Sequence, residues 1–190
     1  MQRLLHVNVG RSREILVGGR AILSAIGKSA VSGAVGAGPM GLDGDEQADL
    51  SVHGGISKAV YAYPVEHYAF WQTVRAQAGV AGWGEALEPG SLGENLTVSG
   101  LLETRVWIGD VLRFADCELA VSEPRLPCAK LNAALGFPDA VKLMTQSRWC
   151  GWYLAVLVPG KLQPGESFEV VPGPREVGIR ELFEARTRRR

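Results

Sequence analysis

Cys128 is the residue whose setting most favours chemistry. It lies in the stretch Ser-Glu-Pro-Arg-Leu-Pro-Cys-Ala-Lys-Leu-Asn at residues 122–132, where two prolines precede it. Because proline fixes the backbone angle φ, the Cys128 side chain should be held in one direction. Arg125 and Lys130 are close in sequence, and nearby cations favour the thiolate, which is both a nucleophile and a ligand for soft metals. A single cysteine is also often an inert core residue, so these residues alone leave both interpretations open.

A second candidate region is acidic and runs into a histidine. Residues 41–49 read Gly-Leu-Asp-Gly-Asp-Glu-Gln-Ala-Asp, and four acids in seven residues suggest a calcium loop. The EF-hand pattern requires Gly at its sixth position and Glu at its twelfth, but counting from Asp43 these are Ala48 and Gly54, which excludes it. His53 lies beside two glycines, where the backbone could pass close to a ligand. A structural histidine is the alternative interpretation.

A third region is a glycine-rich turn, Pro-Gly-Ser-Leu-Gly-Glu-Asn-Leu at residues 89–96, which leads into a predicted strand. Turns of this kind present backbone N–H groups to anions. No Gly-Lys-Ser/Thr follows, so the turn is not a P-loop, and no GxGxxG motif opens a helix anywhere in the chain. Nucleotide binding through either motif is therefore unsupported.

Composition narrows the class of protein. The 190 residues carry 20 basic and 20 acidic side chains, and this balance argues against a general nucleic-acid binder. No apolar run approaches the roughly 20 residues that span a bilayer, and the N-terminal residues do not resemble a signal peptide. Three cysteines without close pairs fit a reducing compartment, and Cys117 and Cys150 are expected to be structural. We therefore expect a cytoplasmic protein without membrane or nucleic-acid partners.

The elements that must position these residues are mostly short strands. The chain contains 24 Gly and 10 Pro spread over its whole length, which is typical of a mostly-β (α+β) domain with many turns. A hairpin is expected at residues 10–13, and a tight turn between two strands at Gly109-Asp110. Strands are predicted at residues 4–9, 14–17, 58–63, 95–98, 105–108, 111–114, 118–122, 152–158 and 167–171. Helices are predicted at residues 64–77, 130–135 and 139–146, with one short helix in residues 175–190.

Taken together, these stretches resemble MOSC-domain proteins of the YiiM type. The resemblance runs in order over about residues 5–173, which makes it far more specific than any single motif. The stretches that carry it are residues 41–47, 52–55, 59–64 with His67, Tyr68 and Trp71, 93–96, 109–110, 124–132 and 151–160.

The resemblance implies a MOSC-type β-barrel at residues 1–173 that holds a molybdenum-pterin cofactor. Cys128 would be the thiolate ligand to molybdenum, and Lys28 and His53 would line the same pocket as catalytic residues. We add Arg125 and Lys130 as counter-charges for the anionic pterin phosphate, and Asn95 as a cofactor contact. Residues 174–190 form one short helix where proteins of this type usually continue into three.

The activity implied is reduction of N-hydroxylated compounds, such as hydroxylaminopurine-like bases, with electrons from a separate flavoprotein. The sequence contains no flavin or nicotinamide fingerprint of its own, which is consistent with an outside donor. Two alternatives stay open. The chain could be a non-catalytic carrier of the molybdenum cofactor or of sulfur, or a cysteine-dependent transferase without molybdenum.

Overall fold

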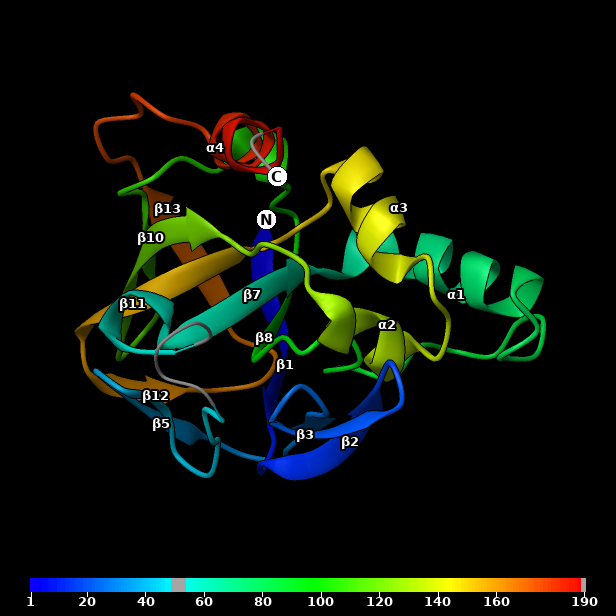
Figure 1. The fold of residues 1–190 in the computed structure, drawn as a ribbon. Coiled ribbons are helices and arrows are strands. Elements are labelled where there is room, and N and C mark those ends of the chain that lie inside the picture. The colour runs from blue at the N-terminus through cyan, green and yellow to red at the C-terminus, as the bar shows by residue number, and fades with distance from the viewer. Residues whose placement is uncertain (49–53, 189–190) are drawn as a thin grey trace.

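Seven strands close into a barrel in the computed structural model, which describes residues 1–48 and 54–188. All neighbouring strands of the barrel are antiparallel except β7 and β8, which are parallel, and pairing of β1 with β13 closes the barrel (Figure 1). In order around the barrel the strands are β13 (Ser167–Val171), β9 (Val111–Arg113), β10 (Glu118–Pro124), β11 (Trp152–Val158), β7 (Val60–Pro64), β8 (Leu96–Ser99) and β1 (Gln2–Val9). The expected β-barrel is confirmed.

Smaller sheets attach to this barrel. The end of β1 also pairs with β4 (Ser29–Ala30), and a three-stranded sheet combines β12 (Gly160–Leu162), β5 (Val35–Gly38) and β6 (Gly41–Leu42). A two-stranded sheet of β2 (Arg13–Val17) and β3 (Arg20–Ser24) packs against helix α2, below it in Figure 1.

The helices are few and short, as predicted. They are α1 (Tyr68–Gln77), α2 (Ala129–Leu135), α3 (Ala140–Ser147) and α4 (Ile179–Thr187), with 3-10 turns η1 (Ile56–Lys58), η2 (Val65–His67) and η3 (Glu103–Arg105). No helix among the described residues is long and apolar enough to cross a membrane.

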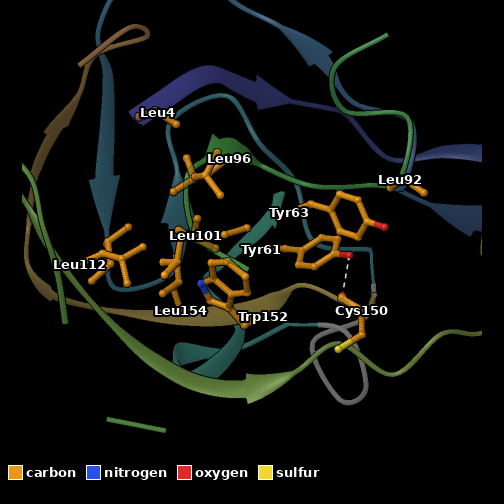
Figure 2. Packing of buried hydrophobic residues seen from close by; sticks show 14 of the residues in the cluster. Leu4, Tyr61, Tyr63, Leu92, Leu96, Leu101, Leu112, Cys150, Trp152 and Leu154 are labelled. Carbon is orange, nitrogen blue, oxygen red and sulfur yellow. Dashed lines mark hydrogen bonds between the residues drawn. The ribbon is translucent and has the colours of Figure 1, made fainter. Parts of the chain in front are cut away.

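The barrel interior is filled by large apolar side chains. Figure 2 shows Leu4, Leu96, Leu112, Leu154 and Trp152 converging inside the ring of strands, and all five are fully buried. Burying one such side chain contributes about 1.5–3 kcal/mol. Ile179 and Phe183 of α4 are equally buried and belong to this same core, so the C-terminal helix is part of one hydrophobic unit with the barrel.

Two local predictions are wrong for identifiable reasons. The hairpin expected at residues 10–13 does not form, because β2 pairs with β3 through a two-residue turn at Gly18 and Gly19, both with positive φ. Two consecutive glycines between β-forming runs are a stronger hairpin signal than the segment we chose. The strand expected at residues 105–108 is instead a 3-10 turn and a loop, folded around the buried Asp110 carboxylate, which accepts hydrogen bonds from the Trp107 and Gly173 backbone N–H groups.

Candidate active site

A single recess gathers most of the side chains singled out above. Its cavity volume is about 90 Å³, and part of the recess is open to solvent. Its walls come from residues 24–28 after β3, residues 45–48 of the acidic stretch, residues 58–61 at the start of β7, the turn before β8, residues 125–130 and Tyr153 on β11. Lys28, Asn95, Arg125, Cys128 and Lys130 all line it. His53 lies outside the described residues, so its predicted role stays a prediction.

Cys128 sits where strand β10 gives way to helix α2. The strand ends at Pro124, the helix begins at Ala129, and Cys128 precedes that first helical residue in an extended conformation (φ −137°, ψ 172°). Its side chain is partly buried and lines the recess. The other two cysteines do not line it, and burial raises the pKa of the Cys117 thiol to about 11 and that of Cys150 well above its ordinary value. Both are therefore neutral thiols at neutral pH, as structural cysteines are expected to be.

Arg125 places a positive charge in the wall of the recess. Its residue is only 5% exposed. The guanidinium donates to the Met144 sulfur at 3.4 Å and lies 5.6 Å from the centre of the Tyr61 ring. Within residues 1–48 and 54–188, the structure pairs Arg125 with no carboxylate. A buried cation without an acidic partner is costly unless an anion is supplied from elsewhere.

Lys28 and Asp45 form an ion pair in the wall of the same recess. Their side chains are 8% and 4% exposed, so the pair is shielded from water. Burial lowers the pKa of Lys28 below its ordinary value, and the carboxylates of Asp45 and Glu94 oppose that effect. A lysine of this kind can hold a proton at neutral pH and still release it more readily than an exposed lysine.

The backbone that carries Lys28 runs tightly against the glycine-rich turn. Gly90 has φ +87°, and a Cβ at this position would lie 2.7 Å from the Lys28 carbonyl oxygen. The Gly90 N–H donates to the buried Glu94 carboxylate at 2.9 Å, which fixes the turn from inside. The turn proposed as an anion site thus supports the backbone of Lys28.

Replacing Gly90 by alanine should therefore destabilise the protein by more than backbone strain alone. Left-handed φ costs an alanine about 1–2 kcal/mol, and contact with the Lys28 carbonyl adds to it. Gly165→Ala is the matched control, because Gly165 has φ +90° and an added Cβ meets nothing within 4 Å. Urea unfolding of the two variants separates strain from contact. Equal losses of unfolding free energy would show that the Gly90–Lys28 approach imposes no constraint.

Asn95 holds the wall together through all of its side-chain polar atoms. Its amide nitrogen donates to the Asn8 carbonyl (3.2 Å) and to Asp45 Oδ2 (2.9 Å), and its amide oxygen accepts from the Tyr61 N–H (3.1 Å). The predicted direct contact of Asn95 with a cofactor stays a prediction. In the structure, the Asn95 amide holds the Asp45 carboxylate in place.

Two tyrosines add an aromatic wall that sequence reasoning missed. The rings of Tyr61 and Tyr153 lie 5.4 Å apart between centroids, and both residues line the recess. Burial raises the pKa of both phenols, so they are uncharged at neutral pH. Lys58 also lines the recess, 6.0 Å from the Tyr153 ring centroid and 3.9 Å from Glu123. Flat neutral surfaces and cations together suit a planar anionic ligand.

Comparison with known proteins agrees with this geometry. The MOSC domain model matches residues 49–169, which is more than half of the chain. The chain belongs to the MOSC-domain family. It is 37% identical over 158 residues to Protein YiiM of Escherichia coli, a match that covers 83% of this chain and 68% of that protein. It is 38% identical over 168 residues to the uncharacterized protein YflK of Bacillus subtilis, covering 88% of this chain and 72% of that protein.

Solved structures place this MOSC-domain protein with the YiiM type. The crystal structure of YiiM from Geobacillus stearothermophilus superposes with a TM-score of 0.77 at 28% identity, covering 98% of this chain and 84% of that one. A protein of Gibberella moniliformis named as a reductase is 35% identical over 172 residues, which are 90% of this chain and 29% of that protein. The MOSC-domain, YiiM-type assignment made from the motifs is therefore confirmed.

Asp45 is the residue of the MOSC recess that local sequence reasoning placed least well. Its sequence neighbours suggest a calcium loop and then exclude one, whereas the structure pairs the Asp45 carboxylate with Lys28. The partner lies 17 residues earlier in sequence, on a segment whose path depends on tertiary packing. A buried ion pair between residues so far apart leaves no periodic pattern in the sequence. The only sequence signal for Asp45 was the high density of acidic residues around it.

Proposed function

We propose that this MOSC-domain protein is a cytoplasmic reductase that binds a molybdenum-pterin cofactor and acts on N-hydroxylated compounds, hydroxylaminopurine-like bases among them, with electrons from a separate flavoprotein. The observation that carries the proposal is one recess with both the Cys128 side chain and the buried Arg125 guanidinium in its walls. The three cysteines of the chain are free thiols, which suits the reducing cytoplasm.

The residues of the recess fit such a cofactor. A thiolate is a suitable ligand for a soft metal. Arg125, whose charge meets no carboxylate among the described residues, would receive its counter-charge from an anionic group of the ligand. Lys130 and Lys58 add positive charge to the walls, and Tyr61 and Tyr153 offer flat faces to a fused ring.

The reaction needs electrons and protons from different sources. Reduction of R–NH–OH to R–NH₂ and water consumes two electrons and two protons, and the bound cofactor would supply the electrons to the substrate. Lys28 Nζ carries a proton that can be given to the departing hydroxyl group, and solvent at the mouth of the recess replaces it. Asp45 holds Lys28 Nζ in the wall while this happens. His53 is proposed as a second proton donor.

The test begins with metal and pterin content of the chain expressed in a host that makes the cofactor. Near-stoichiometric molybdenum, followed by turnover of an N-hydroxylated purine with a flavoprotein donor or a chemical reductant, supports the reductase. Bound molybdenum without turnover under either reductant contradicts the reductase and indicates a carrier. Absence of molybdenum even after reconstitution with free cofactor overturns cofactor binding and favours a cysteine-dependent transferase. The chemical reductant separates a wrong donor from a wrong activity.

A further inference from the structure

We propose that Asp45 is a positioning residue of this recess, which holds the Lys28 ammonium group at a fixed place in the wall and keeps it charged. The importance of this role for catalysis rests on the proposed function, in which Lys28 is the proton donor. Its evidence is the packing of Asp45 itself, and its test reads Lys28 directly.

Both carboxylate oxygens of Asp45 are fixed independently of Lys28. Oδ1 accepts a hydrogen bond from the Gly10 backbone N–H at 2.8 Å, and Oδ2 accepts one from Asn95 Nδ2 at 2.9 Å. Asn95 is in turn bonded to the backbone of Asn8 on β1 and of Tyr61 on β7. The carboxylate is therefore attached to strands of the barrel and has little freedom to follow a moving lysine.

Lys28 reaches this fixed carboxylate from a constrained backbone. The Lys28 carbonyl packs against Gly90, which leaves no room for a Cβ. The ammonium group then meets Asp45 Oδ1 inside the wall, where both side chains are almost fully buried. A lysine side chain normally retains several rotamers, so an ion pair fixed at both ends removes the freedom that a proton donor must lose anyway.

Charge balance gives Asp45 a second role. Desolvation disfavours the ammonium form of Lys28, and Asp45 provides the largest opposing effect, ahead of Glu94. Without the Asp45 carboxylate, the pKa of Lys28 should fall further, because desolvation would remain and the main compensating charge would be gone. Among the residues that the structure describes, the other charged groups that line the recess are Glu46, Lys58, Arg125 and Lys130, and the other titratable groups are Cys128, Tyr61 and Tyr153.

Asp45→Asn tests the proposal through the acylation of Lys28. Trace labelling with acetic anhydride modifies only neutral amines, so the labelling of each lysine rises with pH through its own pKa. Mass spectrometry of the digested full-length chain follows Lys28 beside the exposed Lys161 in the same sample. We expect the Lys28 midpoint to fall by about one to three pH units in Asp45→Asn. A purely structural role would change the labelling plateau without moving the midpoint.

Glu46→Gln is the matched control. Glu46 also lines the recess, but its carboxylate accepts the Ser12 backbone N–H at 2.8 Å, and within the described part of the chain it forms no ion pair with Lys28. Its substitution should move the Lys28 midpoint far less. An unchanged midpoint in folded Asp45→Asn, or equal shifts in the two variants, overturns the proposal.

If circular dichroism shows that Asp45→Asn does not fold, Asp45→Glu tests the positioning role instead. Glutamate retains the negative charge but displaces it by one methylene. The labelling midpoint of Lys28 should therefore lie below that of the parent, but by less than the roughly one to three pH units expected for Asp45→Asn. A midpoint equal to the parent's overturns the positioning role. Because the measurement needs neither cofactor nor substrate, failure of the reductase proposal would leave its outcome unaffected, and the converse also holds.

Discussion

Cys128→Ser should abolish molybdenum binding and reductase activity while changing the free energy of unfolding by less than about 1 kcal/mol. Serine preserves the size of the side chain at a partly buried position just before helix α2. It replaces a thiol, whose thiolate form is a ligand for soft metals, by a hydroxyl, which is a poor one. The metal would lose its soft ligand with the fold intact. Molybdenum content, turnover and urea unfolding measured on the same preparation check all three expectations.

Cys117→Ala is the control for Cys128→Ser. Cys117 is buried and does not line the recess, so its removal should lower stability slightly and leave molybdenum content at the parental level. Retained activity in Cys128→Ser would exclude the thiolate as the essential ligand. Loss of folding in Cys128→Ser would assign Cys128 to the structure of the domain.

Arg125→Met should weaken cofactor binding by about 10- to 100-fold, as expected for loss of a hydrogen bond to a charged group. The same substitution should leave the unfolding free energy of the cofactor-free chain unchanged or higher. Methionine matches the length of the buried side chain. Removing a buried charge that pairs with no carboxylate among the described residues relieves its desolvation cost. A residue that lowers stability but raises binding is the signature of a functional charge.

Arg113→Met provides the comparison for Arg125→Met. Arg113 forms an exposed ion pair with Glu118 at 2.7 Å and does not line the recess. Neither the free energy of cofactor binding nor that of unfolding should therefore change by more than a few tenths of a kcal/mol. Cofactor reconstitution and urea unfolding are the measurements. A loss of several kcal/mol in Arg125→Met with cofactor content unchanged would make Arg125 a structural cation.

The strands of the barrel could be predicted because the residues that define each strand are close together in the sequence. Glycines and prolines divide the chain into short β-forming runs, and seven of the nine predicted strands correspond to strands of the barrel. The run at residues 105–108 was misleading because the Trp107 backbone N–H bonds the Asp110 carboxylate, and the segment forms a 3-10 turn and a loop. The partner of β2 was predicted wrongly because it depends on which of two turns forms. Residues 10–13 and Gly18-Gly19 are both turn-forming segments, and the hairpin forms at Gly18-Gly19.

The candidate site was predictable in unequal parts. Cys128, Arg125 and Lys130 share one stretch of sequence, and the structure places all three on the recess. Lys28 lies a hundred residues earlier, and nothing local marked it; the family resemblance did. Three features required the three-dimensional arrangement: the Lys28–Asp45 pair, the wall of Tyr61 and Tyr153, and the bonds that Asn95 makes. Each joins residues that lie far apart in the sequence.

Closure of the barrel between β1 and β13 also sets the order of events during synthesis. Strand β1, Gln2–Val9, is synthesised long before its barrel neighbour β13, Ser167–Val171. Until then the start of β1 and the whole of β9 lack their β13 partner, and unpaired strand edges of this kind are where nascent chains aggregate. The domain therefore completes its folding only after nearly all of it has been translated, and a ribosome stalled before Ser167 releases an open sheet in place of a barrel.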